Sequence, residues 1–224
     1  MGRYTQNMLV QERQADVGEL APAYSTRVVE ASHDRCEDRI EVIHLPDRTV
    51  FVIADGAGGV AGGAAAAKAV CRAVADRCRQ DEIADWTGWL TLIDREIAGS
   101  KDCGFAAVAI VEIENDGKIV GSSVGDCEAW VFVNGMALKN LTIGQIRKPL
   151  LGGGDAIPVG FEGSVAGGTL LMATDGLWKY LDRIRIAEAT SIRPLETAAE
   201  ALIDGARLKS GALQDDIAVA IVGW

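Results

Sequence analysis

The feature that most constrains the chain is residues 49–59, where an apolar run stops at an acid and passes into glycines and alanines. Residues 50–53 are apolar and mostly β-branched, as is typical of a buried strand. Gly56 and the glycines after it permit a tight turn and a close approach of other groups to the backbone. An alanine-rich helical pattern starts near residue 61. The stretch therefore predicts a strand, a turn and a helix, with Asp55 at the end of the strand.

Two interpretations of Asp55 follow from this setting. A carboxylate and nearby carbonyl groups at the mouth of a turn are ligands that Mg2+ and Mn2+ prefer. Alternatively, Asp55 caps the following helix, because Asp accepts hydrogen bonds from the first free N–H groups of helices. A short glycine motif occurs often by chance, so it does not decide between the metal-ligand and the helix-cap interpretation of Asp55.

The composition excludes some classes of function. The chain of 224 residues has 22 Lys and Arg against 32 Asp and Glu, a formal charge of −10, whereas nucleic-acid-binding surfaces are basic. The same balance disfavours an anionic membrane surface as a partner. The five cysteines lack CxxC spacing, so they predict neither a zinc site nor a disulfide framework. With no signal-peptide pattern or apolar run of spanning length, we expect reduced thiols in a cytoplasmic protein.

Alternating and continuous apolar runs, bounded by turn residues, indicate the strands and helices. Residues 40–45 and 49–53 flank a Pro-Asp turn and predict a hairpin, and an Asn-Gly pair at 134–135 predicts another turn. Strands are predicted at 24–31, 40–45, 49–53, 105–113, 118–124, 128–133, 169–174 and 217–222. Helices are predicted at 61–79, at 86–98 and twice between 183 and 209.

We expect residues 1–224 to form one domain, since the chain has no linker, repeat or low-complexity segment. Residues 1–20 are mostly polar and are expected either to be a loosely ordered extension or to add an edge strand. Residues 142–168 are rich in loop-forming residues, and a loop of this length in a compact domain is usually functional or mobile.

Acidic residues recur where predicted strands begin or end. Four such junctions can meet at one rim of a sheet assembly, where unpaired carboxylates would resist ionising together. One or two divalent cations would offset that repulsion, so the cluster is expected to be a metal-binding site. The junctions are Glu37-Asp38, Asp55-Gly56, Asp175-Gly176 and Asp215-Asp216.

These motifs, in this order, resemble those of the metal-dependent protein phosphatase family, type 2C. The resemblance runs from about residue 24 to the C-terminus, and the order and spacing of the motifs make it specific. It implies an α+β fold in which two packed antiparallel β-sheets are flanked by helices, an α-β-β-α sandwich. The matching pieces are Glu37-Asp38, residues 55–59, Gly125-Asp126, residues 174–178, and Asp215-Asp216 before an apolar strand.

The resemblance also implies a site with two Mn2+ or Mg2+ ions. Asp55 would bridge both ions, and Asp38 would orient metal-bound water. The remaining ligands of the two ions would be the Gly56 carbonyl and the carboxylates of Glu37, Asp175 and Asp215. Residues 142–168 would be a flap-like loop beside the site.

Two departures from the family pattern bear on the site. The family usually has an Arg four residues before Glu37, where this chain has His33; Arg35 would share a face with both residues in an extended segment. Either Arg35 or a charged His33 would then bind the substrate phosphate, unless Arg35 is a surface charge. Asp126 would help to hold a third ion, but Lys179 stands where many relatives have the second acid for it. Lys179 either fills that space electrostatically or is an exposed helical charge.

The sequence thus predicts a serine/threonine protein phosphatase that hydrolyses phosphomonoesters with a water activated by two divalent metals. Its partners would be a phosphoserine or phosphothreonine protein substrate and a cognate kinase. Neither nucleic acid nor a membrane is expected as a partner. Two alternatives stay open. One is a pseudophosphatase that acts as a regulatory binding module, and the other is a small-molecule phosphatase on the same fold.

Overall fold

The computed structural model describes residues 8–13, 22–31, 36–57, 62–80 and 85–224. Its strands form two antiparallel sheets. The six-stranded sheet has the order β1 (Met8–Arg13), β2 (Ala23–Val29), β11 (Ile217–Gly223), β10 (Thr169–Ala173), β7 (Glu128–Val133) and β8 (Met136–Asn140). The five-stranded sheet has the order β3 (Asp38–His44), β4 (Arg48–Gly56), β5 (Ala106–Glu114), β6 (Lys118–Val124) and β9 (Val159–Ser164).

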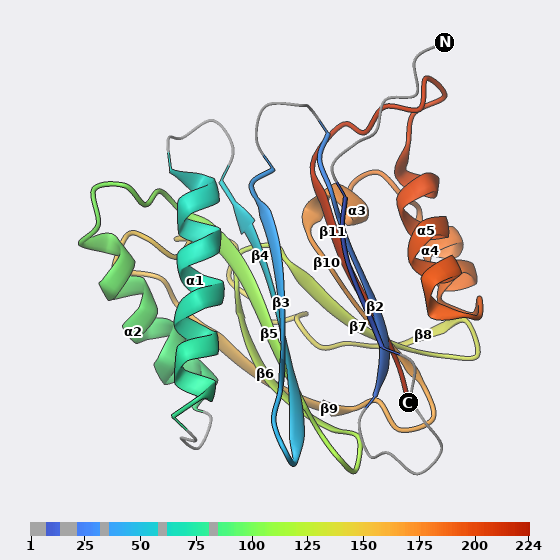
Figure 1. The fold of residues 1–224 in the computed structure, drawn as a ribbon, viewed down its shortest axis with the longest axis horizontal. Helices are drawn as coiled ribbons and strands as arrows, with labels where there is room; N and C mark the ends of the chain where they lie inside the picture. Colours follow the sequence, from blue (N-terminus) through green and yellow to red (C-terminus); the bar gives the residue numbers. More distant parts are fainter. Residues whose placement is uncertain (1–7, 14–21, 32–35, 58–61, 81–84) are drawn as a thin grey trace.

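The helices cover the outer faces of the two sheets (Figure 1). Helices α1 (Gly63–Cys78) and α2 (Trp86–Ala98) pack on the five-stranded sheet. Helices α3 (Asp175–Trp178), α4 (Arg183–Thr190) and α5 (Leu195–Ala206) pack on the six-stranded sheet. The order of layers is therefore helix, sheet, sheet, helix, which is the α+β sandwich predicted from the sequence.

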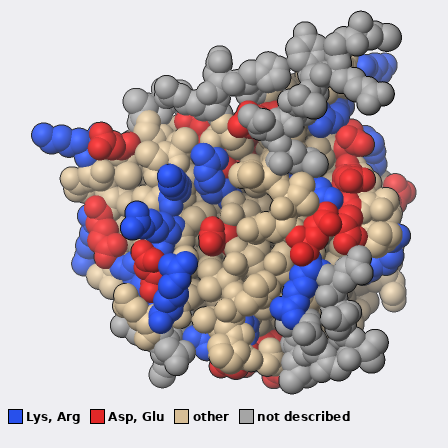
Figure 2. Space-filling model, viewed as in Figure 1, with Lys and Arg blue, Asp and Glu red and all other residues tan. Residues whose placement is uncertain are grey.

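None of the described helices combines the length and the apolar character that crossing a membrane requires. The face of the molecule in Figure 2 carries acidic and basic side chains around a strip without charge.

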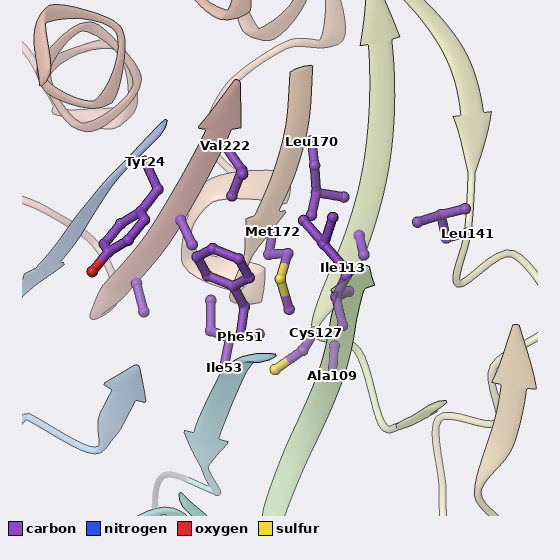
Figure 3. Close-up of a cluster of buried hydrophobic side chains, with 14 of the residues drawn as sticks. Tyr24, Phe51, Ile53, Ala109, Ile113, Cys127, Leu141, Leu170, Met172 and Val222 are labelled. Atoms are coloured by element: carbon purple, nitrogen blue, oxygen red, sulfur yellow. The ribbon is translucent and has the colours of Figure 1, made fainter. Parts of the chain in front are cut away.

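The main core lies between the two sheets. Phe51 and Ile53 of β4 meet Leu170 and Met172 of β10 there (Figure 3). Alternate residues of β4, Val50 among them, face α1 and α2 instead. Because side chains alternate along a strand, the inward face that carries position 53 also carries position 55.

Most of the predicted elements are present. The hairpin of residues 40–45 and 49–53 is the antiparallel pair β3–β4. The Asn-Gly turn joins β7 to β8, and both of its residues have positive φ. At the N-terminal end, β1 is the edge strand of its sheet, and the rest of residues 1–20 lies outside the described residues.

Residues 142–168, expected to be a flap-like loop rich in loop-forming residues, contain one strand that the sequence analysis did not predict. Residues Val159–Ser164 form β9, which pairs with β6 at the edge of the five-stranded sheet. Its sequence has two glycines, and its side chains are only partly buried or exposed. An edge strand of this kind has no run of apolar residues, so its sequence resembles that of a loop.

Candidate active site

One end of the sandwich collects the acidic junctions. In antiparallel sheets, the start of one strand lies beside the end of the next. Asp38, the first residue of β3, is therefore paired directly with Asp55 near the end of β4. Asp175 follows β10, and Asp215 precedes β11 at the same end of the pair β10–β11.

These acids line a single cavity of about 320 Å³. Every residue that the sequence predicted as a metal ligand lies on its wall, together with residues that were not predicted. The lining residues are Glu37, Asp38, Asp55, Gly56, Ala57, Ala107, Asp126, Leu150, Asp175, Lys179, Asp215 and Asp216.

Three carboxylates in the cavity come especially close. Asp55, Asp126 and Asp175 each offer an oxygen, and these oxygens all lie within 4.8 Å of one another. They come from β4, from the turn after β6 and from α3. All three ligand atoms are carboxylate oxygens, and hard divalent cations are held by oxygen ligands. The donor set therefore fits Mg2+ or Mn2+.

The carboxylates strongly perturb one another. Burial, together with Asp175, Asp126 and Asp215, raises the pKa of Asp55 to about 8. Burial and the neighbouring Asp55 raise the pKa of Asp38 well above its usual range. The pKa of Asp215 is raised by burial and by Asp175. Negative charge accumulates here without enough compensation from the protein, as expected of a site that receives cations.

Among the described residues that line the cavity, Lys179 is the one cation. The Lys179 ammonium forms an ion pair with the Asp175 carboxylate, one helical turn earlier. This contact raises the pKa of Lys179, which stays charged. Burial and the Asp175 carboxylate raise the pKa of Asp126, and the Lys179 ammonium offsets part of that rise. Lys179 is therefore an exposed charge at the end of α3, 51% exposed, and it also acts electrostatically on the acids of the cavity.

A buried hydroxyl fixes Asp38. Oγ1 of Thr174 donates a 2.7 Å hydrogen bond to Oδ2 of Asp38, and it accepts one of 2.9 Å from the backbone N–H of Ala218. Thr174 and Asp38 are almost fully buried. The Thr174 side chain thus joins β3, β10 and β11 at the floor of the site.

The second acid of the pair at 215–216 has a structural role. Oδ1 of Asp216 accepts a 2.8 Å hydrogen bond from the N–H of Ala31, and Oδ2 accepts one of 2.8 Å from the N–H of Glu37. Asp216 therefore holds the backbone on both sides of residues 32–35. His33 and Arg35, predicted to bind phosphate, lie outside the described residues.

Glycines let the backbone close around the acids. A Cβ atom on Gly56 would collide with the backbone of Gly63, the first residue of α1. A Cβ atom on Gly63 would lie 2.9 Å from Oε1 of Glu37. The Glu37 carboxylate is thus packed against the start of α1, where the helix dipole favours negative charge.

The loop before β9 contributes Leu150 to the lining of the cavity and is anchored to α2. Asp94 of α2 is 1% exposed, and its carboxylate accepts hydrogen bonds of 2.6, 3.0 and 2.9 Å from the N–H groups of Gly152, Gly154 and Ala156. Leu151 and Ala106 exchange two backbone hydrogen bonds, which brings Leu150 to the cavity.

Thr174 and Asp216 lie within motifs that the sequence placed at the site, but their hydrogen-bonding roles were not predicted, and Asp94 was not predicted at all. Thr174 and Asp216 are next to predicted ligands in the sequence, and this adjacency could have pointed to their roles. No sequence feature pointed to Asp94, because its hydrogen-bond partners lie about 60 residues away. Burial, together with the carboxylates of Asp216 and Asp38, raises the pKa of the Cys36 thiol to about 12, which disfavours the reactive thiolate.

The chain matches the family model of stage II sporulation protein E (SpoIIE) over residues 46–224. A comparison with curated proteins gave no significant match. Among solved structures, a bacterial serine phosphatase is 18% identical, with a TM-score of 0.75, over 89% of this chain and 96% of its own.

Two further structures are named with metals. The catalytic domain of the serine/threonine phosphatase PstP, solved with 2 manganese ions, is 21% identical with a TM-score of 0.69, over 90% of this chain and 97% of its own. RsbX in complex with magnesium is 14% identical with a TM-score of 0.71, over 96% of this chain and 98% of its own. At these identities the structural likeness shows the fold, while function depends on the site.

Proposed function

The chain belongs to the SpoIIE/PPM-type family of bacterial serine/threonine phosphatases, and on that premise we propose that it is a metal-dependent protein phosphatase. The reaction would be hydrolysis of a phosphoserine or phosphothreonine monoester by water. The observation that carries the proposal is the single cavity in which carboxylates from separate strand junctions meet.

Two divalent cations, Mn2+ or Mg2+, would be held by Asp55, Asp175, Asp215, Glu37 and the Gly56 carbonyl. Asp126 is close enough to Asp55 and Asp175 to share one of them. When bound, the cations would lower the pKa of a water molecule and offset charge on the phosphoryl group. Structures named with two manganese ions and with magnesium support this choice of metal.

The residues of the chain would have complementary roles. Asp38, fixed by Thr174, would accept a hydrogen bond from the attacking water and orient it. Lys179 lines the cavity, paired with Asp175, and its ammonium would attract the phosphate dianion. Arg35 would make a bidentate contact with the phosphate, with His33 as the alternative.

Conversion of Asp55 to Asn tests the proposal. Asp55→Asn should remove nearly all Mn2+-dependent hydrolysis of para-nitrophenyl phosphate and of a phosphothreonine peptide while leaving the fold intact. The matched control is Asp116→Asn, the same change at an exposed turn. Near-normal turnover by Asp55→Asn, or no turnover by the wild type with either metal, would refute the proposal.

A second candidate is a pseudophosphatase that binds phosphoproteins without hydrolysing them. The ion pair between Lys179 and Asp175 favours it, because it engages a proposed ligand. The wild type would then bind a phosphopeptide but would not release phosphate from it.

The third candidate is a phosphatase of small phosphorylated metabolites. Rates of phosphate release from metabolites and from phosphopeptides at equal concentration distinguish it from a protein phosphatase.

A further inference from the structure

A groove of about 770 Å³ lies away from the acidic cavity, beside α1. Three consecutive residues of β3, Arg39 to Glu41, and three of β1, Leu9 to Gln11, line it. Because neighbouring side chains of a strand point to opposite faces, three consecutive lining residues place the edge of a strand along the groove. Both strands are the outermost of their sheets. The groove is therefore bordered by two strand edges that pair with no described strand.

The third border of the groove is a basic face of α1. Lys68, Arg72 and Arg79 line it, and in Figure 2 basic side chains gather beside the uncharged strip on this face of the molecule. With Arg39, the lining has four cations against two acids, Glu41 and Asp76.

Asp76 is already engaged by two of these cations. It lies 2.7 Å from Arg79 and 3.7 Å from Arg72. Lys68 has no carboxylate within ion-pair distance among the described residues. A net positive groove in a chain of charge −10 is a local reversal of the overall field.

We propose that this groove is a docking site for an acidic, extended segment of a partner protein. The segment would add a strand to the free edge of β3, with alternate carboxylates directed at the cations of α1. Eleven residues separate Lys68 from Arg79, about 16 Å along a helix. That length corresponds to roughly five residues of extended chain.

A second copy of this chain is a poorer occupant. A symmetric pairing through the groove would place each basic face near its own equivalent, and like charges in an interface oppose association. The exposed apolar residues Leu9 and Val10 at the rim, 68% and 42% exposed, instead suit the apolar side chains that alternate with acids in a docked strand.

The test uses the full chain and a fluorescently labelled hexapeptide of alternating glutamate and valine. Binding measured by anisotropy should saturate. The double variant Lys68→Glu/Arg72→Glu should weaken it by about tenfold or more. The matched control, Lys101→Glu/Lys209→Glu, makes the same charge change at exposed residues elsewhere and should stay within about twofold.

A second arm needs no variant of the protein. A hexapeptide with proline at a central position lacks one backbone N–H and should bind about tenfold more weakly to the wild type. The proposal would be overturned if both double variants weakened binding equally. It would also be overturned if the proline peptide bound as tightly as the unmodified peptide, or if binding did not saturate. A wild-type dimer in light scattering that Lys68→Glu/Arg72→Glu converts to a monomer would overturn it as well. None of these measurements depends on turnover.

Discussion

Oδ2 of Asp38 accepts a 2.7 Å hydrogen bond from the hydroxyl of Thr174, a residue 136 positions away in the sequence. The same hydroxyl accepts a hydrogen bond from Ala218, so one side chain connects three strands beneath the acidic cavity. A carboxylate that must hold a water molecule in a fixed orientation needs such a constraint on its own rotamer.

We predict that Thr174→Val impairs both stability and turnover, whereas Thr174→Ser keeps both. Valine matches threonine in shape but leaves Oδ2 of Asp38 and the N–H of Ala218 without partners. Each buried group left unsatisfied costs about 1–3 kcal/mol. Urea denaturation and the kcat for para-nitrophenyl phosphate measure the two effects. Wild-type kcat in Thr174→Val would show that Asp38 needs no such support.

The metal-free protein should lose stability as the pH rises from about 4 to about 8. Unfolded Asp55 releases its proton near pH 4, whereas folded Asp55 retains it up to a pKa of about 8. The unfolded state therefore binds fewer protons in this window, and higher pH favours unfolding. Melting temperatures measured in chelator should fall across the window, less steeply in Asp55→Asn. Added Mn2+ should flatten the wild-type profile; a melting temperature that rises with pH contradicts the mechanism.

Lys179 should limit the number of bound cations to two. A third cation near Asp126 would meet the Lys179 ammonium and would lack one carboxylate ligand. Lys179→Asp should create or strengthen a third site at millimolar Mn2+, and Lys179→Met, which removes the charge without adding a ligand, should do so much less. Anomalous scattering from Mn2+-soaked crystals counts the ions. Three fully occupied peaks in the wild type would contradict this prediction.

Asp94 should control the loop that carries Leu150. In Asp94→Asn, the amide NH2 group would face an N–H donor of the loop, so at least one of three hydrogen bonds is lost, at about 1–3 kcal/mol. We expect lower stability and a higher KM for a phosphopeptide. Asp85→Asn, the same change at the N-cap of α2, is the control and should be nearly neutral. Equal effects of the two variants would rule out a specific clamp.

Arg35, rather than His33, should make the main phosphate contact. Arginine presents a permanently charged, bidentate fork, and histidine is only partly charged near neutral pH. Arg35→Ala should therefore raise KM more than His33→Ala does. The reverse ranking, with an acid-shifted pH optimum that His33→Ala abolishes, would assign the role to His33.

Much of the fold was predictable because burial leaves a local pattern. The apolar run before Asp55 and the small-residue pattern of α1 each have the period of the element that they form, and the Asn-Gly turn has its own backbone preference. The acidic motifs likewise sit beside these runs in the sequence. Where the pattern is weak, as in the glycine-containing edge strand β9, the prediction failed.

The sequence by itself determined the strand junctions and the acids placed at them, since these follow from short-range periodicity, and the family resemblance of those motifs implied the two-sheet class. Only the tertiary structure decided that Thr174 supports Asp38, that Asp94 anchors residues 152–156, and that β1 and β3 border one basic groove. Each of these relations joins residues far apart in the chain. A hydrogen bond or a groove between distant segments depends on how the layers pack, and packing at long range imposes no periodic signature on the residues that take part.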